Sequence, residues 1–325
     1  MISIVLVNYN GLKWLDKCLT SLRNQTYKNI EIIIVDNASL DESVKFIKNH
    51  FPNVKLIERT LNEGFASGNN IGINEAKGEY IMLLNIDTWL ENDFIERLYK
   101  SYRENKCDVT GPVETNYFSI KKRSYISLID FLGHPIHVSK SQDKKDFYLS
   151  GVCLFFKKDF YIETKGMDNN FFMYFEETDW FWRLQLLDKV IYRESSLYLP
   201  HAGATESFNS IKYERFLWRN KNQLQMLLKN YQWYNLLWII PIYLMQNMFE
   251  VVTFLIVGKP KISLSYLQGI VFNITNWSKI KEQRRWVQKH RKKSDFSVFK
   301  DMYIGSGKFY HFLEFIKTRI KNGNI

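Results

Sequence analysis

The stretch Ser3-Ile4-Val5-Leu6-Val7-Asn8-Tyr9-Asn10-Gly11 decides the fold, because a short apolar run passes directly into polar residues. We interpret it as a first strand and not as a signal peptide, since it has no basic segment and no cleavage site. Runs of the same kind recur at 30–35, 54–57 and 80–84, and their length and composition predict three further strands.

Helical spacing of apolar residues fills the intervals between these strands. Leu12, Leu15, Leu19 and Leu22 recur on one face, and similar patterns follow at 44–51, 66–76 and 94–102. Ser39 and Glu42 have the spacing of a capping box at the start of the second helix. Strands that alternate with helices predict an α/β fold built on a mainly parallel sheet. Between 116 and 147 the pattern weakens, which predicts a loop or an irregular insertion.

Polar residues follow all four predicted strands. In open α/β sheets ligands bind beyond the carboxyl ends of the strands, so these residues are candidates for a binding site. Asn, Asp and Gly also dominate ordinary turns, which is the alternative interpretation for any one of them. Four such ends in register favour the binding site. They are 8–11, 36–39, 62–70 and 85–88.

The ordered set of motifs resembles family-2 glycosyltransferases of the GT-A (Rossmann-like) fold, and most closely the rhamnosyltransferase-like group. The resemblance covers roughly residues 1 to 225, which we take as a nucleotide-sugar-binding domain. The matching segments are 5–10, 34–39, 62–70, 83–88 and 172–179, with His201 and Arg219-Asn220. The resemblance implies an inverting hexosyltransferase whose donor is dTDP-rhamnose or a UDP-sugar. The implied acceptor is a glycan or a polyprenyl-linked molecule in cell-surface polysaccharide or glycoconjugate synthesis.

The resemblance also implies a donor site and a metal site. Asp87 matches the last aspartate of the family's Asp-x-Asp motif, and His201 matches a histidine that completes the metal site. The implied cofactor is a divalent cation, Mg²⁺ or Mn²⁺, which neutralises the leaving diphosphate. Asn85 replaces the motif's first aspartate, so this site offers one carboxylate fewer. The implied donor-binding residues are Asn8, Tyr9, Asn10, Asp36, Asn37, Asn62, Gly64, Gly68 and Asn85.

An acidic cluster among aromatic residues is the candidate for the catalytic base. Glu177 occupies the position of the family's base, an aspartate, which would take the proton of the acceptor hydroxyl. Glu176 and Asp179 are the next candidates. The alternative interpretation is a helix N-terminus, where the helix dipole favours acids.

The region 226–325 differs in composition and is predicted to be helical and membrane-associating. Residues 236–257 are almost wholly apolar, but they include Gln246, Asn247 and Glu250. An interfacial or re-entrant hairpin, a span, and a soluble core or oligomer contact all remain open. Residues 281–293 hold seven basic residues against Glu282, a local charge of +6, which suits an anionic membrane surface. We therefore expect the protein to bind the cytoplasmic face of the cell membrane, in a peripheral or re-entrant manner.

Two other functions fit parts of the sequence. The net charge of +11 is compatible with nucleic-acid binding, but the basic run adjoins an apolar segment, which favours lipid, and we expect no nucleic-acid partner. A sugar nucleotidyltransferase would need a Gly-rich, Arg-containing loop after the first strand, and 8–11 does not provide one. Three cysteines without paired spacing predict no disulfide framework.

Overall fold

The computed structural model describes residues 1–116, 125–139, 145–203 and 213–310. Contacts divide the chain into two compact units, each described separately below. The sheet unit comprises 1–124, 149–180 and 189–211, and the helical unit comprises 125–148, 181–188 and 212–325. The helical unit thus takes in segments from the middle of the sequence as well as the C-terminal region.

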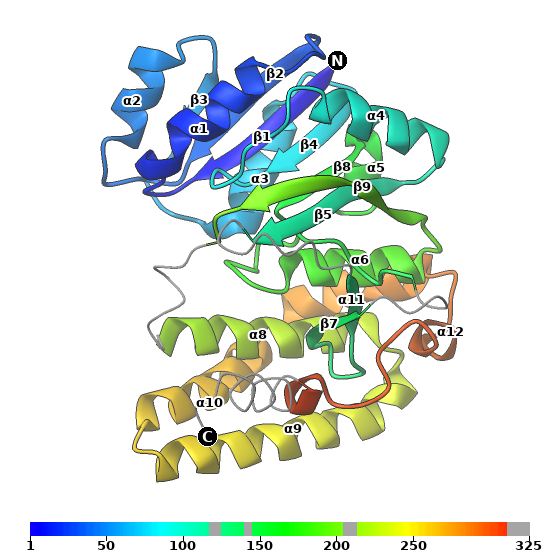
Figure 1. Ribbon diagram of the computed structural model, residues 1–325. Coiled ribbons are helices and arrows are strands. Elements are labelled where there is room, and N and C mark those ends of the chain that lie inside the picture. The colour runs from blue at the N-terminus through cyan, green and yellow to red at the C-terminus, as the bar shows by residue number, and fades with distance from the viewer. Residues whose placement is uncertain (117–124, 140–144, 204–212, 311–325) are drawn as a thin grey trace, which may run out of the picture. The chain divides into compact units, whose positions relative to one another are not determined.

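A seven-stranded sheet forms the centre of the sheet unit, in the order β3-β2-β1-β4-β8-β5-β9 (Figure 1). Its strands are β1 (Ile2–Asn8), β2 (Ile30–Asp36), β3 (Lys55–Glu58), β4 (Tyr80–Leu84), β5 (Val109–Asn116), β8 (Cys153–Lys157) and β9 (Ile191–His201). The first four strands are parallel to one another, and β5 is parallel to β9. Only β8 runs antiparallel to its neighbours, so the mainly parallel α/β sheet is confirmed.

Helices cover both faces of the sheet because its central strands are apolar on both sides. The helices are α1 (Leu12–Arg23), α2 (Ser43–His50), α3 (Gly64–Glu75), α4 (Phe94–Glu104) and α5 (Lys158–Glu163). Ile4 and Leu6 of β1 pack in one core with α1, α2 and α4. Val5 and Val7 point to the other face, where α3 lies so close that a Cβ on Gly72 or Gly68 would meet them within 3 Å.

An irregularity in the pairing of β5 with β9 determines which of their residues lie at the carboxyl edge of the sheet. Pro112 pairs with Glu194, but the next residue, Val113, pairs with Tyr198. Three residues of β9 are therefore left out of the ladder, as in a β-bulge, which re-aims the side chains beyond it. The carboxyl ends of β5 and β9 then carry Glu114 and His201 to the same edge as the ends of β1, β2 and β4.

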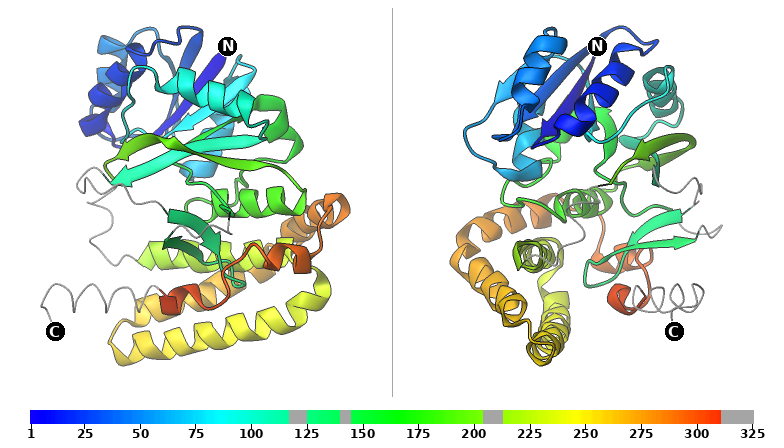
Figure 2. Two further views of the ribbon diagram at one scale, coloured as in Figure 1. Left: turned by 45° about the vertical axis from the view of Figure 1, so that its right-hand side comes forward. Right: turned by 60° about the vertical axis from the view of Figure 1, so that its left-hand side comes forward.

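The helical unit is built around α8 (Tyr213–Asn230), which packs against α10 (Pro260–Thr275) and α11 (Trp277–His290). The right-hand view of Figure 2 looks nearly along α8 and α9 (Trp233–Ile256). The unit also contains α12 (Asp295–Phe299), the end of α6 (Glu176–Leu186) and a hairpin of β6 (Tyr125–Ile129) and β7 (Pro135–Ser139).

Two local expectations were wrong. Part of 116–147 forms the β6–β7 hairpin and not a loop, while 117–124 and 140–144 lie outside the described residues. The capping box does not form: α2 begins at Ser43, whose backbone N–H donates to Asp41 Oδ1 at 3.1 Å and not to Ser39. The Ser39 hydroxyl is instead 2.7 Å from Asp36 Oδ1, to which it donates, because this loop is organised around the aspartate.

Candidate active site

The ends of β1 and β2 form one hydrogen-bonded platform. Asn8 and Asp36 pair in register, and Asn8 Nδ2 donates to Asp36 Oδ1 at 2.7 Å. Ser39 donates its backbone N–H to Asp36 Oδ2 at 2.9 Å, so both carboxylate oxygens are held in place. Asn10 adopts a left-handed φ of 53° and receives a hydrogen bond from the Leu40 backbone at its Oδ1. Tyr9, at 50% exposure, projects beside this platform.

The loop before α3 is tied to the same platform. Asn37 Nδ2 donates to the Gly64 carbonyl at 2.9 Å, and the Gly64 N–H donates to Asn62 Oδ1 at 2.9 Å. Gly64 has a φ of +89°, and a Cβ there would lie 2.1 Å from the carbonyl oxygen of Phe172. Gly68 faces Val7 across the helix–sheet contact. Both glycines therefore have packing roles, and direct contact with a donor stays a prediction for them.

Asp87 and His201 come together beyond the ends of β4 and β9. His201 Nε2 is 3.1 Å from Asp87 Oδ2, and Nδ1 is 2.7 Å from Glu114 Oε1. Burial lowers the pKa of His201, but hydrogen bonds to Asp87 and then Glu114 outweigh it and raise the pKa to about 9. Without a cation the imidazolium therefore bridges two carboxylates. No sequence motif pointed to Glu114, because it reaches this position through the irregular β5–β9 pairing.

This donor set fits a divalent cation. Adjacent ligands at about 2.1 Å from an octahedral ion are roughly 3 Å apart, which matches the separation of His201 Nε2 and Asp87 Oδ2. A carboxylate on Nδ1 is the usual outer partner of a metal-binding histidine, and Glu114 supplies it. Within the described residues no cluster of three or more acidic, His or Cys side chains stands ready for a metal. The diphosphate and water would complete the shell of the cation. Asn85 precedes Asp87 by two residues, and its side chain makes no hydrogen bond to described residues.

The acidic cluster lies in the first turn of α6, so the helix-dipole interpretation also holds. Tyr174 and Phe175 precede it with left-handed φ values of 71° and 69°. Such strain costs about 1 kcal/mol or more per residue and is concentrated at functional sites. The strained backbone at Tyr174 and Phe175 thus sets the direction in which α6 begins, at a cost in stability.

Glu176 and Glu177 are unusual buried acids. Each has a buried Oε2 atom with no hydrogen-bond partner among the residues that the structure describes. Burial raises the pKa of both carboxyls; the nearby Glu177 adds to the shift of Glu176, and Glu114 adds to that of Glu177. Asp179 is completely buried and Glu177 only partly, which makes Glu177 the most accessible of the three acids. Glu114, which also pairs with His201, thus acts electrostatically on Glu177.

Comparisons with known proteins identify the kind of domain that carries these residues. Residues 3–164 match the model of "Glycosyl transferase family 2". This segment is a family-2 glycosyltransferase domain. The chain is 33% identical over 135 residues to "Glycosyltransferase GlyA" of Streptococcus pneumoniae serotype 4, which covers 41% of this chain and 19% of that protein. It is 39% identical over 115 residues to "Poly(ribitol-phosphate) beta-glucosyltransferase" of Bacillus spizizenii, covering 34% of this chain and 18% of that one.

A solved structure supports the fold of the glycosyltransferase domain. "Crystal structure of GalNAc-T7 with UDP, GalNAc and Mn2+" superimposes with a TM-score of 0.63 at 16% identity, covering 72% of this chain and 49% of that chain. The likeness confirms the GT-A fold, followed here by C-terminal helices. The chain spans less than two thirds of the length of each of these three proteins. The family assignment confirms the resemblance read from the sequence, while the rhamnosyltransferase-like subgroup stays a prediction.

Proposed function

We propose that the protein is a metal-dependent, inverting glycosyltransferase that moves a sugar from a nucleotide-sugar donor to a glycan or lipid-linked acceptor in cell-surface polysaccharide or glycoconjugate synthesis. One observation carries the proposal: His201 joins Asp87 and Glu114 at the carboxyl edge of the sheet, and Glu114 also raises the pKa of Glu177, whose Oε2 atom has no hydrogen-bond partner among the described residues. A nucleoside platform lies at the same edge. The candidates for the donor are dTDP-rhamnose, from the subgroup resemblance, and a UDP-sugar, which the UDP-bound GalNAc-T7 favours.

The roles of the residues follow from their positions. Asn8 and Asp36 would hold the nucleoside, with Tyr9 against its base. Asp87 and His201 would hold Mg²⁺ or Mn²⁺, and the cation would neutralise charge on the departing diphosphate. Glu177 accepts the proton of the acceptor hydroxyl. At the same time the hydroxyl oxygen bonds to the anomeric carbon of the donor sugar, and the bond between that carbon and the diphosphate oxygen breaks. In-line attack inverts the anomeric configuration. The raised pKa of Glu177 makes it a stronger base than an exposed glutamate.

Two variants test the catalytic assignment. Asp87→Ala should abolish metal-dependent transfer and remain folded, and normal turnover at saturating Mn²⁺ would contradict the metal assignment. Glu177→Gln keeps the shape of the side chain and should lower the transfer rate by roughly 10²-fold or more without loss of donor binding. Glu176→Gln and Asp179→Asn are the matched controls. If either of these is the inactive variant instead, the base is misassigned.

The helical unit supports membrane association, because many polar side chains share its interior with apolar ones while large apolar side chains lie on its surface. Its interior holds many polar side chains, namely Asn220, Asn222, Gln223, Gln225, Lys229, Asn230, Asn247, Ser263, Ser265 and Asn273. Its surface carries exposed apolar ones: Leu237, Leu244, Met245, Met248, Phe249, Val252, Leu255, Ile256, Leu264, Leu267, Val271 and Ile274. A helix surface of this kind suits contact with lipid, where polar groups must face the protein.

Helix α9 is long and apolar enough to cross a bilayer and is the one such helix among the described residues. The polar residues that disfavoured a span from sequence turn toward the unit's interior: Asn247 is buried, and Glu250 is bound by the Tyr266 hydroxyl and Lys308. Their polarity therefore does not oppose lipid contact along the outer face. We propose that α9 and α10 bind the cytoplasmic face of the membrane, in a peripheral or re-entrant manner.

The basic run is divided between structure and surface. Arg284 donates to the carbonyls of Leu228 and Tyr231 at 2.6 and 2.5 Å, and Arg291 pairs with the buried Asp295. The expectation that the whole run faces lipid head groups therefore fails for these arginines. Lys281, Arg285, Lys289 and Lys292 are exposed, and the first three recur every fourth residue on one face of α11.

Liposome flotation tests the membrane proposal. Binding should require anionic lipid, weaken in high salt, and fall on changing Lys281, Arg285, Lys289 and Lys292 together to Gln. The matched control changes four exposed lysines of the sheet unit, Lys28, Lys45, Lys48 and Lys100, which removes the same charge. Equal loss in the two variants, or a detergent-free protein that ignores anionic liposomes, would contradict the proposal and favour an oligomer contact.

A further inference from the structure

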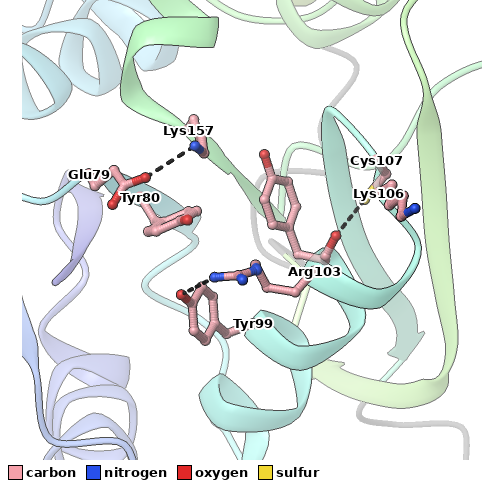
Figure 3. Close-up of a pocket in the computed structure, with 8 residues that line it drawn as sticks. Glu79, Tyr80, Tyr99, Arg103, Lys106, Cys107 and Lys157 are labelled. Atoms are coloured by element: carbon pink, nitrogen blue, oxygen red, sulfur yellow. Dashed lines mark hydrogen bonds and ion pairs between the residues drawn. The ribbon is translucent and has the colours of Figure 1, made fainter.

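A second hollow lies at the opposite edge of the sheet from the candidate active site. The end of α4, the start of β4 and the end of β8 line it, and its volume is about 560 Å³ (Figure 3). Small-molecule sites commonly occupy 300–1,000 Å³. Tyr80 at this edge begins β4, whose other end leads to Asp87. Five strand residues separate the two edges by roughly 16 Å, so a small ligand cannot occupy both sites.

Cationic and hydroxyl-bearing side chains dominate this hollow, and only one carboxylate lines it. Arg103 donates to the Tyr99 hydroxyl at 3.3 Å but meets no carboxylate in the described ranges. Lys106 makes no ion pair within the same ranges, and the Tyr102 hydroxyl has no hydrogen-bond partner there. The single acid, Glu79, is already paired with Lys157 at 3.1 Å. Three cations against one acid give the hollow a net charge of +2.

The position of Lys106 is strained. It follows Asn105, the C-cap of α4, and has a left-handed φ of 46°. Helices usually end this way with glycine, which adopts the conformation without steric cost. A lysine here is less stable than a glycine by about 1 kcal/mol. Lys165 and Asp188 adopt the same conformation just after α5 and α6, so this is a recurrent helix ending in the chain.

Aromatic rings form one wall of the hollow. Tyr80 packs edge-on against Tyr99, with ring centroids 5.1 Å apart, and stacks on Phe155 behind it. Burial raises the pKa of Tyr80 to about 12, so its hydroxyl remains a donor at neutral pH. Tyr80 is only 6% exposed, so the partly exposed Tyr99 offers the main aromatic contact for the apolar face of a sugar or polyol, and hydroxyl donors suit its hydroxyls.

We propose that this hollow, the basic tyrosine pocket, binds the phosphate of a phosphorylated sugar or polyol. Arg103, Lys106 and Tyr102 supply donors for the phosphate oxygens, and charge-assisted hydrogen bonds are the stronger kind. Tyr80 and Tyr99 contact the attached sugar or polyol. The ligand is either a free sugar phosphate or a unit of a phosphate-bearing polymer held away from the reacting end. The pocket is separate from the proposed transferase site and does not depend on it.

Calorimetric titration with defined probes tests the proposal. The probes are inorganic phosphate, glucose 1-phosphate, a glycerol-phosphate hexamer and uncharged glucose. One glucose 1-phosphate or one hexamer should bind per chain, and glucose should not. A hexamer that binds at least tenfold more tightly than glucose 1-phosphate identifies the polymer as the source, and equal affinities identify the free sugar phosphate.

Four variants locate the binding. Affinity should fall at least tenfold in Arg103→Gln/Lys106→Gln and about fivefold in Tyr102→Phe. It should be unchanged in Lys100→Gln, an exposed cation of the same helix outside the pocket, and in Asp87→Ala. The proposal is overturned if no phosphate probe binds, if Lys100→Gln weakens binding as much as the double variant, or if Asp87→Ala removes it. These outcomes need no transferase activity, so they are independent of the proposed function.

Discussion

Replacing Gly64 with alanine should damage both the stability of the sheet unit and the geometry of the acidic cluster. The new Cβ would lie 2.1 Å from the Phe172 carbonyl oxygen, and the residue has a φ of +89°. The left-handed conformation costs an alanine about 1 kcal/mol. Displacing a backbone carbonyl costs a further 2 kcal/mol or so, as in overpacked cores. The same carbonyl accepts a hydrogen bond from Phe65 N–H at 2.8 Å, worth about 1 kcal/mol. We expect a total loss of roughly 4 kcal/mol.

Gly203→Ala is the matched control, because Gly203 has a φ of +64° and an added Cβ would meet no atom of the described residues within 4 Å. It should cost only the conformational term of about 1 kcal/mol. Denaturant unfolding measures both variants. Below its melting range, Gly64→Ala should also lower transfer by about 10²-fold, because Phe172 leads into Glu176 and small displacements of a base are costly. Equal destabilisation by the two alanines would refute the reasoning.

Three further predictions concern single side chains. Glu114→Gln should weaken Mn²⁺ binding in the presence of a nucleoside diphosphate by at least tenfold in calorimetry, because it removes the carboxylate that orients His201, and unchanged affinity would contradict this. Glu176→Gln should stabilise the protein by roughly 1–3 kcal/mol at pH 8. Since the folded pKa of Glu176 is raised, its stabilising contribution exists below the unfolded pKa and disappears as the pH rises through the folded pKa. The gain should therefore vanish near pH 4, and a gain independent of pH would exclude this cause. Arg284→Ala should destabilise the helical unit by about 2 kcal/mol through its lost carbonyl contacts, whereas exposed Arg285→Ala should change stability by less than about 0.5 kcal/mol in thermal unfolding.

The sequence predicted the first half of the sheet well because its strands are apolar on both faces. The runs at 30–35 and 80–84 coincide with β2 and β4 to within one residue. The short strands β6 and β7 escaped detection, since five-residue strands with polar positions resemble loops. Ser39 was misjudged because a nearby carboxylate, invisible as a partner in the sequence, binds its hydroxyl.

The candidate site was predictable in its residue types and only partly in its geometry. Asp87 and His201 were paired through the resemblance, and the structure places them 3.1 Å apart. Glu114 could not be found, because its place depends on three β9 residues left out of the ladder. The exposed apolar face of the helical unit was hidden for a similar reason: periodicity identifies a helix but not which of its faces is buried.

Thermal unfolding with a panel of nucleotide sugars and Mn²⁺ tests the central claim most directly. A ligand at one hundred times its dissociation constant stabilises the native state by about 2.7 kcal/mol. We predict that dTDP-rhamnose or one UDP-sugar raises the melting temperature by roughly 5–10 °C, and that Asp87→Ala removes the Mn²⁺-dependent part of the shift. A panel in which no nucleotide sugar moves the melting temperature would contradict the account.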